Sequence, residues 1–126
     1  MVEGGPPREG ATGREDAVAD VRHEDAGIVV RLAGELDLYN AHEIRDTLLA
    51  CCAESPQRLV IDLSGVTFID STALGVLIEA RTRLPNRRGF LLASPGLETR
   101  RALEISGLDR HFAVHDSVDA ALSASL

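Results

Sequence analysis

The fold is decided by residues 58–84, which read RLVIDLSGVTFIDSTALGVLIEARTRL. Leu59–Ile61 and Leu63 form a short apolar run rich in β-branched residues, which predicts a buried strand. Ser64-Gly65 predicts a turn, after which residues 66–69 return the chain to the edge of the sheet. Asp70-Ser71-Thr72 then predicts the start of a helix, because these side chains accept hydrogen bonds from the free amide groups at a helix N-terminus.

The helix that follows is predicted to be amphipathic. On a wheel of about 100° per residue, its apolar side chains share one broad face, which is typical of a helix packed on a sheet. This predicted core face contains Ala73, Leu74, Leu77, Ile78, Ala80 and Leu84. The opposite, solvent-facing side is predicted to contain Thr72, Gly75, Val76, Glu79 and Arg83.

Gly75 lies inside this helix, where glycine costs about 1 kcal/mol relative to alanine. The sequence leaves two explanations open. A neighbouring element of the same fold approaches the helix closely, or Gly75 provides a flat exposed spot for the backbone of another protein. Val76 is apolar on the predicted solvent side, which fits the second explanation.

Strands and helices are predicted to alternate along the rest of the chain. Before the central stretch we expect strands at 18–22 and 27–32 and a helix at 40–53 capped by Asn40 and Glu43. After it we expect a strand at 90–93, a helix from Ser94-Pro95 to Gly107, a strand at 112–114 and a helix at 116–126. The alternation predicts parallel crossovers, with the first strand added antiparallel at the edge of the sheet.

The composition limits both the number of domains and the possible functions. A chain of 126 residues with 44% hydrophobic and 26% charged residues is expected to form one domain. Residues 1–17, rich in Gly, Pro, Glu and Arg, are predicted to be a disordered tail before a domain at 18–126. The net charge of −7 argues against nucleic-acid binding. All 13 basic residues are arginine, which excludes the lysine of a P-loop or a Schiff base.

Compartment and cysteine state follow from similar reasoning. No run approaches 18 apolar residues and no signal peptide is recognisable, so we expect a cytoplasmic protein that does not span a membrane. Cys51 and Cys52 are adjacent and are the only cysteines, so we expect free thiols.

Two motifs resemble a known family. Asp70-Ser71-Thr72-Ala73-Leu74-Gly75 follows a strand and resembles the STAS-domain signature of bacterial anti-sigma factor antagonists, Asp-Ser-(Ser/Thr)-Gly-Leu-Gly. Ala73 departs from it, because the family usually has glycine there. Gly34–Asp37 resembles a second family motif, and the likeness covers residues 18–124. It implies an α/β STAS fold, with a mixed, mostly parallel sheet of four to five strands and about four helices.

The resemblance also implies a function. The unphosphorylated protein would bind an anti-sigma factor with serine kinase activity and free a sigma factor. Ser71 would be the phosphoacceptor, with Thr72 as second choice, and a serine phosphatase would reset it. The implied partner-binding surface contains Gly34, Glu35, Asp37, Asp70, Ser71, Thr72, Gly75, Val76 and Glu79. The protein would be a monomer or weak dimer with no catalysis, cofactor or metal of its own.

Alternative interpretations remain open for this site. From the residues alone, Ser71 is more simply a helix N-cap, and only the resemblance favours phosphorylation. Asp70 and Asp37 are expected at the same edge of the sheet, where they would orient the partner or merely cap and solvate turns. The replacement of glycine by Ala73 favours a second function, a STAS scaffold or ligand-sensing module that is never phosphorylated.

Enzyme and metal sites are disfavoured. A response-regulator receiver needs a lysine, which is absent, and Ser71 lacks the Gly-x-Ser-x-Gly context of a hydrolase. His111 and His115 would lie about 13 Å apart on a strand, too far to share a metal ion.

Overall fold

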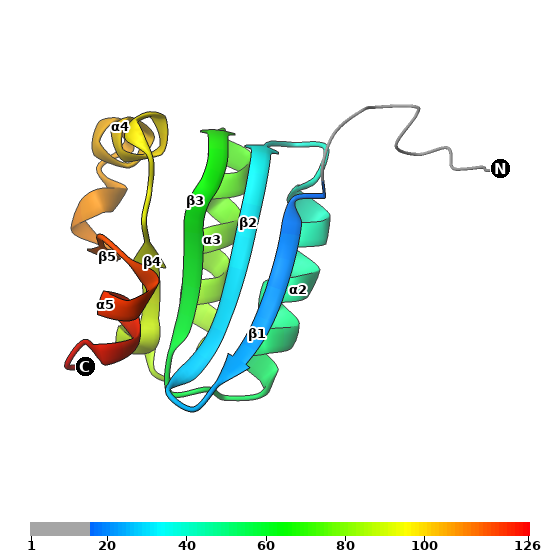
Figure 1. The fold of residues 1–126 in the computed structure, drawn as a ribbon. Helices are drawn as coiled ribbons and strands as arrows, with labels where there is room; N and C mark the ends of the chain where they lie inside the picture. The colour runs from blue at the N-terminus through cyan, green and yellow to red at the C-terminus, as the bar shows by residue number, and fades with distance from the viewer. Residues whose placement is uncertain (1–15) are drawn as a thin grey trace, which may run out of the picture.

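A five-stranded sheet in the order β1-β2-β3-β4-β5 organises residues 16–126, the part of the chain described by the computed structural model (Figure 1). The strands are β1 (Val18–Glu24), β2 (Gly27–Leu36), β3 (Leu59–Ile69), β4 (Phe90–Ala93) and β5 (Ala113–His115). β1 is antiparallel to β2, and all other neighbours are parallel. This confirms the predicted fold class and the antiparallel first strand.

The helices cover the two faces of the sheet unequally. Helices α2 (Ala41–Ala53) and α3 (Ser71–Arg83) lie side by side on one face, whereas the short α5 (Val118–Ser123) packs on the other (Figure 1). Helix α4 (Leu97–Ser106) follows β4, and the two 3₁₀ turns are η1 (Arg87–Gly89) and η2 (Leu108–Arg110). The larger core therefore lies under α2 and α3, and a smaller one lies under α5.

The predicted turn at Ser64-Gly65 is wrong, because β3 is one continuous strand of 11 residues. The register between β2 and β3 shifts twice: Arg31 pairs with Asp62 but Ala33 with Gly65, and Gly34 pairs with Val66 but Glu35 with Phe68. Each shift places one extra residue in β3. The Asp62 carboxylate accepts a hydrogen bond from the amide of Ser64 at 3.0 Å at the first shift. The polar pair therefore makes a bulge instead of reversing the chain.

Two predicted helix caps are wrong. The Asn40 side chain turns back toward β2, so its amide oxygen accepts from the amide of Asp37 and makes no capping bond to α2. Ser94 has φ +56 and donates its hydroxyl to the carbonyl of Asp116, and α4 begins at Leu97, two residues after the expected first position at Pro95. The Asn40 side chain is taken by a bond within its own loop, and the Ser94 side chain by a tertiary contact.

The ends of the domain also differ from expectation. Residues 1–15 of the predicted tail lie outside the described residues, but Ala17 is buried, and its carbonyl accepts from the amide of Ala33 at 2.9 Å. The terminal helix is shorter than the predicted 116–126, because Ser117 caps it through the amide of Ala120. The C-terminal end of α4 is confirmed at Gly107, with φ +79.

Both cysteines are free, as the sequence predicted, and both are buried. Burial raises the pKa of Cys51 to about 11, and burial also raises the pKa of Cys52. The Cys52 thiol donates to the carbonyl of Ala80 on the neighbouring helix at 3.4 Å. Both side chains therefore stay protonated at neutral pH, and Cys52 contributes to the contact between α2 and α3.

Candidate partner-binding site

The candidate site forms where β2 and β3 end side by side. Leu36 pairs with Ile69, and the carbonyl of Leu36 accepts from the amide of Asp70 at 3.0 Å. One carboxylate oxygen of Asp70 then accepts from the amide of Leu38 at 3.1 Å. These bonds join the loop after β2 to the start of α3, and confirm that the Asp37 and Asp70 segments share one edge of the sheet.

Asp70, not Ser71, caps α3. Its second carboxylate oxygen accepts from the amide of Ala73 at 3.0 Å, which is the bond expected of an N-cap. Ser71 is the first residue of the helix, its side chain is exposed, and no other described residue hydrogen-bonds its hydroxyl. The interpretation of Ser71 as the cap is therefore wrong, and its hydroxyl is available to a partner. Thr72 is exposed beside it.

Gly75 is exposed one turn further along α3. A Cβ added there would meet no atom within 4 Å outside the local helix backbone. The first explanation for this glycine, close approach by another element of the fold, is therefore wrong for the described residues. The second explanation remains, in which Gly75 provides a flat exposed spot for the backbone of another protein.

The predicted faces of α3 are wrong at two residues. Val76, expected on the solvent side, is 8% exposed, whereas Ile78, expected in the core, is 42% exposed. The helix wheel assumed burial against the sheet alone. Because α2 packs along one side of α3, the buried face turns toward α2 and takes in Val76. Val76 is thus a core residue and does not offer a side chain to a partner.

Glu79 is engaged within the fold. Its two carboxylate oxygens accept from Nε and Nη2 of Arg45 on α2 at 2.8 and 2.9 Å, and Arg83 lies 3.5 Å away. The hydrogen bond from Arg45, aided by the charges of Arg45 and Arg83, lowers the pKa of Glu79. Glu79 therefore presents an ionised, fixed carboxylate beside the exposed face of α3.

The loop after β2 is braced by a residue that the sequence analysis used only as a cap. The amide oxygen of Asn40 accepts from the amide of Asp37 at 2.9 Å, and its amide nitrogen donates to the carbonyl of Glu35 at 2.7 Å. Gly34 has φ +79 and lies with the exposed Glu35 in the last residues of β2, so the strand continues through the Gly34–Leu36 part of the motif expected to end it. The loop is thus held in one conformation at the start of α3.

Two exposed apolar residues on this loop were missed by the sequence analysis. Leu38 and Tyr39 have exposed fractions of 63% and 76%. Their position between the Gly34–Asp37 motif and α2 was the available signal, because an apolar pair in a connecting loop has no core to face. They lie next to Asp70, since the amide of Leu38 donates to its carboxylate.

Comparison with known proteins identifies this arrangement. Residues 17–121 match the STAS domain. The chain belongs to the STAS-domain family. The sequence of this STAS domain is 32% identical over 95 residues to the anti-sigma-F factor antagonist RsfB of Mycobacterium tuberculosis, covering 75% of this chain and 78% of the relative. It is 35% identical over 91 residues to the anti-sigma-B factor antagonist of Bacillus subtilis, covering 71% and 82%.

A solved structure agrees with this assignment. The STAS domain superposes on the crystal structure of an anti-sigma factor antagonist from Mycobacterium paratuberculosis with a TM-score of 0.79 and 34% identity. The superposition covers 87% of this chain and 95% of that one. Within residues 16–126, no helix has the length and apolar character needed to span a bilayer. The described residues also contain no cluster of three or more His, Cys, Asp or Glu side chains that could hold a metal ion.

Proposed function

We propose that this STAS domain is a cytoplasmic anti-sigma factor antagonist whose partner is an anti-sigma factor with serine kinase activity. The unphosphorylated domain binds this partner and frees a sigma factor. Phosphorylation of Ser71 releases the domain, and a serine phosphatase restores it. The names of the relatives given above support an anti-sigma factor as the partner. In this proposal the domain itself performs no catalysis.

The observation that carries the proposal is the exposed Ser71 hydroxyl at the first position of α3. Asp70 already caps the helix, so the hydroxyl has no structural bond to lose. The surrounding partner surface contains the braced loop with Leu38 and Tyr39, the exposed Thr72 and the open position at Gly75. Such a surface combines apolar anchors with a small polar switch residue.

Ala73 does not weaken this proposal. Its side chain is 1% exposed and faces the core, while its amide donates to the Asp70 carboxylate. The methyl group that replaces the family glycine therefore leaves the exposed surface unchanged. Ala73 no longer favours the alternative function of an unphosphorylated scaffold or ligand-sensing module.

Electrostatics make phosphorylation an effective release step. A phosphate adds about −1.5 to −2 charges at neutral pH. Each added charge, placed about 5 Å from one acidic group of a partner at an effective dielectric constant near 20, costs roughly 3 kcal/mol. Screening by salt halves this cost or more. The remaining repulsion weakens binding on the order of a hundredfold.

Phosphorylation by the partner kinase tests the proposal. We expect wild-type protein incubated with this kinase and ATP to gain the mass of one phosphate, and Ser71→Ala to gain none. Thr72→Ala is the matched control and should be modified like the wild type. Because Ser71 is an exposed residue without a capping bond, Ser71→Ala should change the free energy of unfolding by less than about 0.5 kcal/mol.

Two results would contradict the proposal. A phosphate that persists in Ser71→Ala but is lost in Thr72→Ala would move the site to Thr72. A domain that binds its partner but is modified by no kinase would instead fit the scaffold or ligand-sensing alternative.

A further inference from the structure

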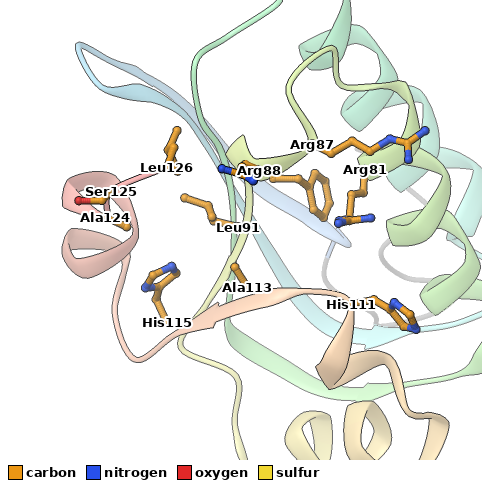
Figure 2. A pocket seen from close by; sticks show the side chains of 11 residues that line it. Arg81, Arg87, Arg88, Leu91, His111, Ala113, His115, Ala124, Ser125 and Leu126 are labelled. Carbon is orange, nitrogen blue, oxygen red and sulfur yellow. The ribbon is translucent and has the colours of Figure 1, made fainter.

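A cavity of about 410 Å³ lies at the β5 edge of the sheet, away from the partner surface. Its lining includes Arg81 from α3, Arg87 and Arg88 from η1, His111 directly after η2 and His115 at the end of β5. Figure 2 shows Arg88 and His115 toward the segment 124–126, and Arg81 and His111 on the other side of Ala113. No Asp or Glu side chain is among the lining residues described.

The three cavity arginines have no carboxylate partner among the described residues. Of the other described arginines, five form ion pairs with carboxylates (Arg22, Arg45, Arg83, Arg100 and Arg101), whereas Arg31, Arg58 and Arg110 form none. Within residues 16–126, the three cavity arginines form no ion pair, although the chain has 20 acidic residues and a net charge of −7. Like charges around one cavity repel each other unless an anion lies between them.

The backbone of η1 is held in place by two local contacts. The Asn86 side chain accepts from the amide of Arg88 at 3.2 Å. A Cβ at Gly89 would clash with the carbonyl oxygen of Gln57, so η1 packs directly on the backbone before β3. The backbone of this turn is thus fixed, and the Arg87 and Arg88 side chains extend from it in different directions (Figure 2).

We propose that this cavity binds a small multivalent oxyanion, a polyphosphate or a polycarboxylate. Arginine forks bind such groups through paired, charge-assisted hydrogen bonds. The volume lies within the range of about 300–1,000 Å³ that small-molecule sites occupy. The site goes beyond the proposed function, because Arg81 lies ten residues after Ser71, or about 15 Å along the axis of α3.

Titration of the ¹⁵N-labelled full chain with pyrophosphate, and separately with citrate, at about 0.15 M salt tests the proposal. We expect saturable amide shifts at residues 87–91 and 113–115 with at least one of the two anions, and the tighter binder identifies the ligand class. Arg88→Gln and Arg81→Gln should each weaken binding about tenfold, the loss expected for one charge-assisted contact. Both residues lie at the surface, and the amide spectrum checks that each variant folds.

Arg101→Gln on α4 is the matched control, because it removes the same charge outside the cavity. It should bind the anion like the wild type. Shifts that do not saturate, or an equal loss in Arg101→Gln, would show diffuse charge attraction and overturn the proposal. Tighter binding of a polyglutamate peptide than of either anion would also overturn it, by assigning the surface to an acidic protein segment. Phosphorylation at Ser71 should be unchanged in Arg88→Gln, so the two proposals can fail separately.

Discussion

At Gly75 the requirements of folding stability and of partner binding oppose each other. It lies in the middle of α3, and an added Cβ would meet open space. Alanine restricts the unfolded chain and is the better helix former, so we expect Gly75→Ala to raise the free energy of unfolding by about 0.5–1 kcal/mol. Urea denaturation measures this change.

The same substitution should weaken binding to the anti-sigma factor, because the methyl group projects from the flat spot that we assign to the partner surface. Thr82→Ala changes another exposed position near the far end of α3 and should leave the affinity unchanged. If Gly75→Ala is more stable and binds as tightly as the wild type, Gly75 does not belong to the interface.

For helices and strands, the sequence predicted the features that depend on one segment alone. It did not predict the features that depend on contacts between segments. The strand at Phe90–Ala93 and the end of α4 at Gly107 were correct, because each depends on a local apolar run or a local positive φ. The predicted solvent exposure of Val76 and Ile78 was reversed, because a helical wheel contains no information about the neighbouring helix α2.

In the candidate site, too, local features were predictable from the sequence and contacts between segments were not. Its location was predictable, because adjacent parallel strands must end at the same edge of the sheet. The bond from Leu38 to Asp70 and the Arg45–Glu79 pair join separate segments, because their partners are 32 and 34 positions apart in the chain. No local pattern in the sequence specifies such pairs.

The Arg45–Glu79 pair predicts a pH-dependent link between α2 and α3. Arg45 lowers the pKa of Glu79 in the folded state, so the pair stabilises the fold fully above the unfolded carboxyl pKa of about 4.3. This stabilisation is lost as the pH falls through the lower, folded pKa. Glu79→Gln should therefore be less stable than the wild type at pH 7, and the difference should vanish in acid.

Urea denaturation of both proteins across this pH range measures the effect. Glu98→Gln is a suitable control, because Glu98 lies 4.0 Å from Arg101 within one helix and joins no two elements. A deficit in Glu79→Gln that persists unchanged below the folded pKa would mean that the amide disturbs packing and not charge.

In the whole molecule, the partner surface and Ser71 lie on a part of the fold that can keep its conformation when Ser71 is phosphorylated. Asp70 holds both the loop after β2 and the start of α3, while Ser71 contributes no bond that a phosphate would break. The free amide groups and the dipole of the first helical turn favour an anion there. We therefore expect phosphorylation to act through the charge on the surface and not through a change of fold.

This expectation can be tested on the phosphorylated chain and on Ser71→Asp. Amide shifts should be confined to residues 36–40 and the first turns of α3, and the urea midpoint should stay close to that of the wild type. Affinity for the anti-sigma factor should fall, on the order of a hundredfold for the phosphate and less for the single charge of aspartate. Ala120→Asp is the matched control, since it adds one charge in the first turn of α5 on the opposite face of the sheet. Equal affinity of Ser71→Asp and Ala120→Asp would show that charge at Ser71 does not release the partner, and shifts across β1 to β5 would show that the fold itself responds.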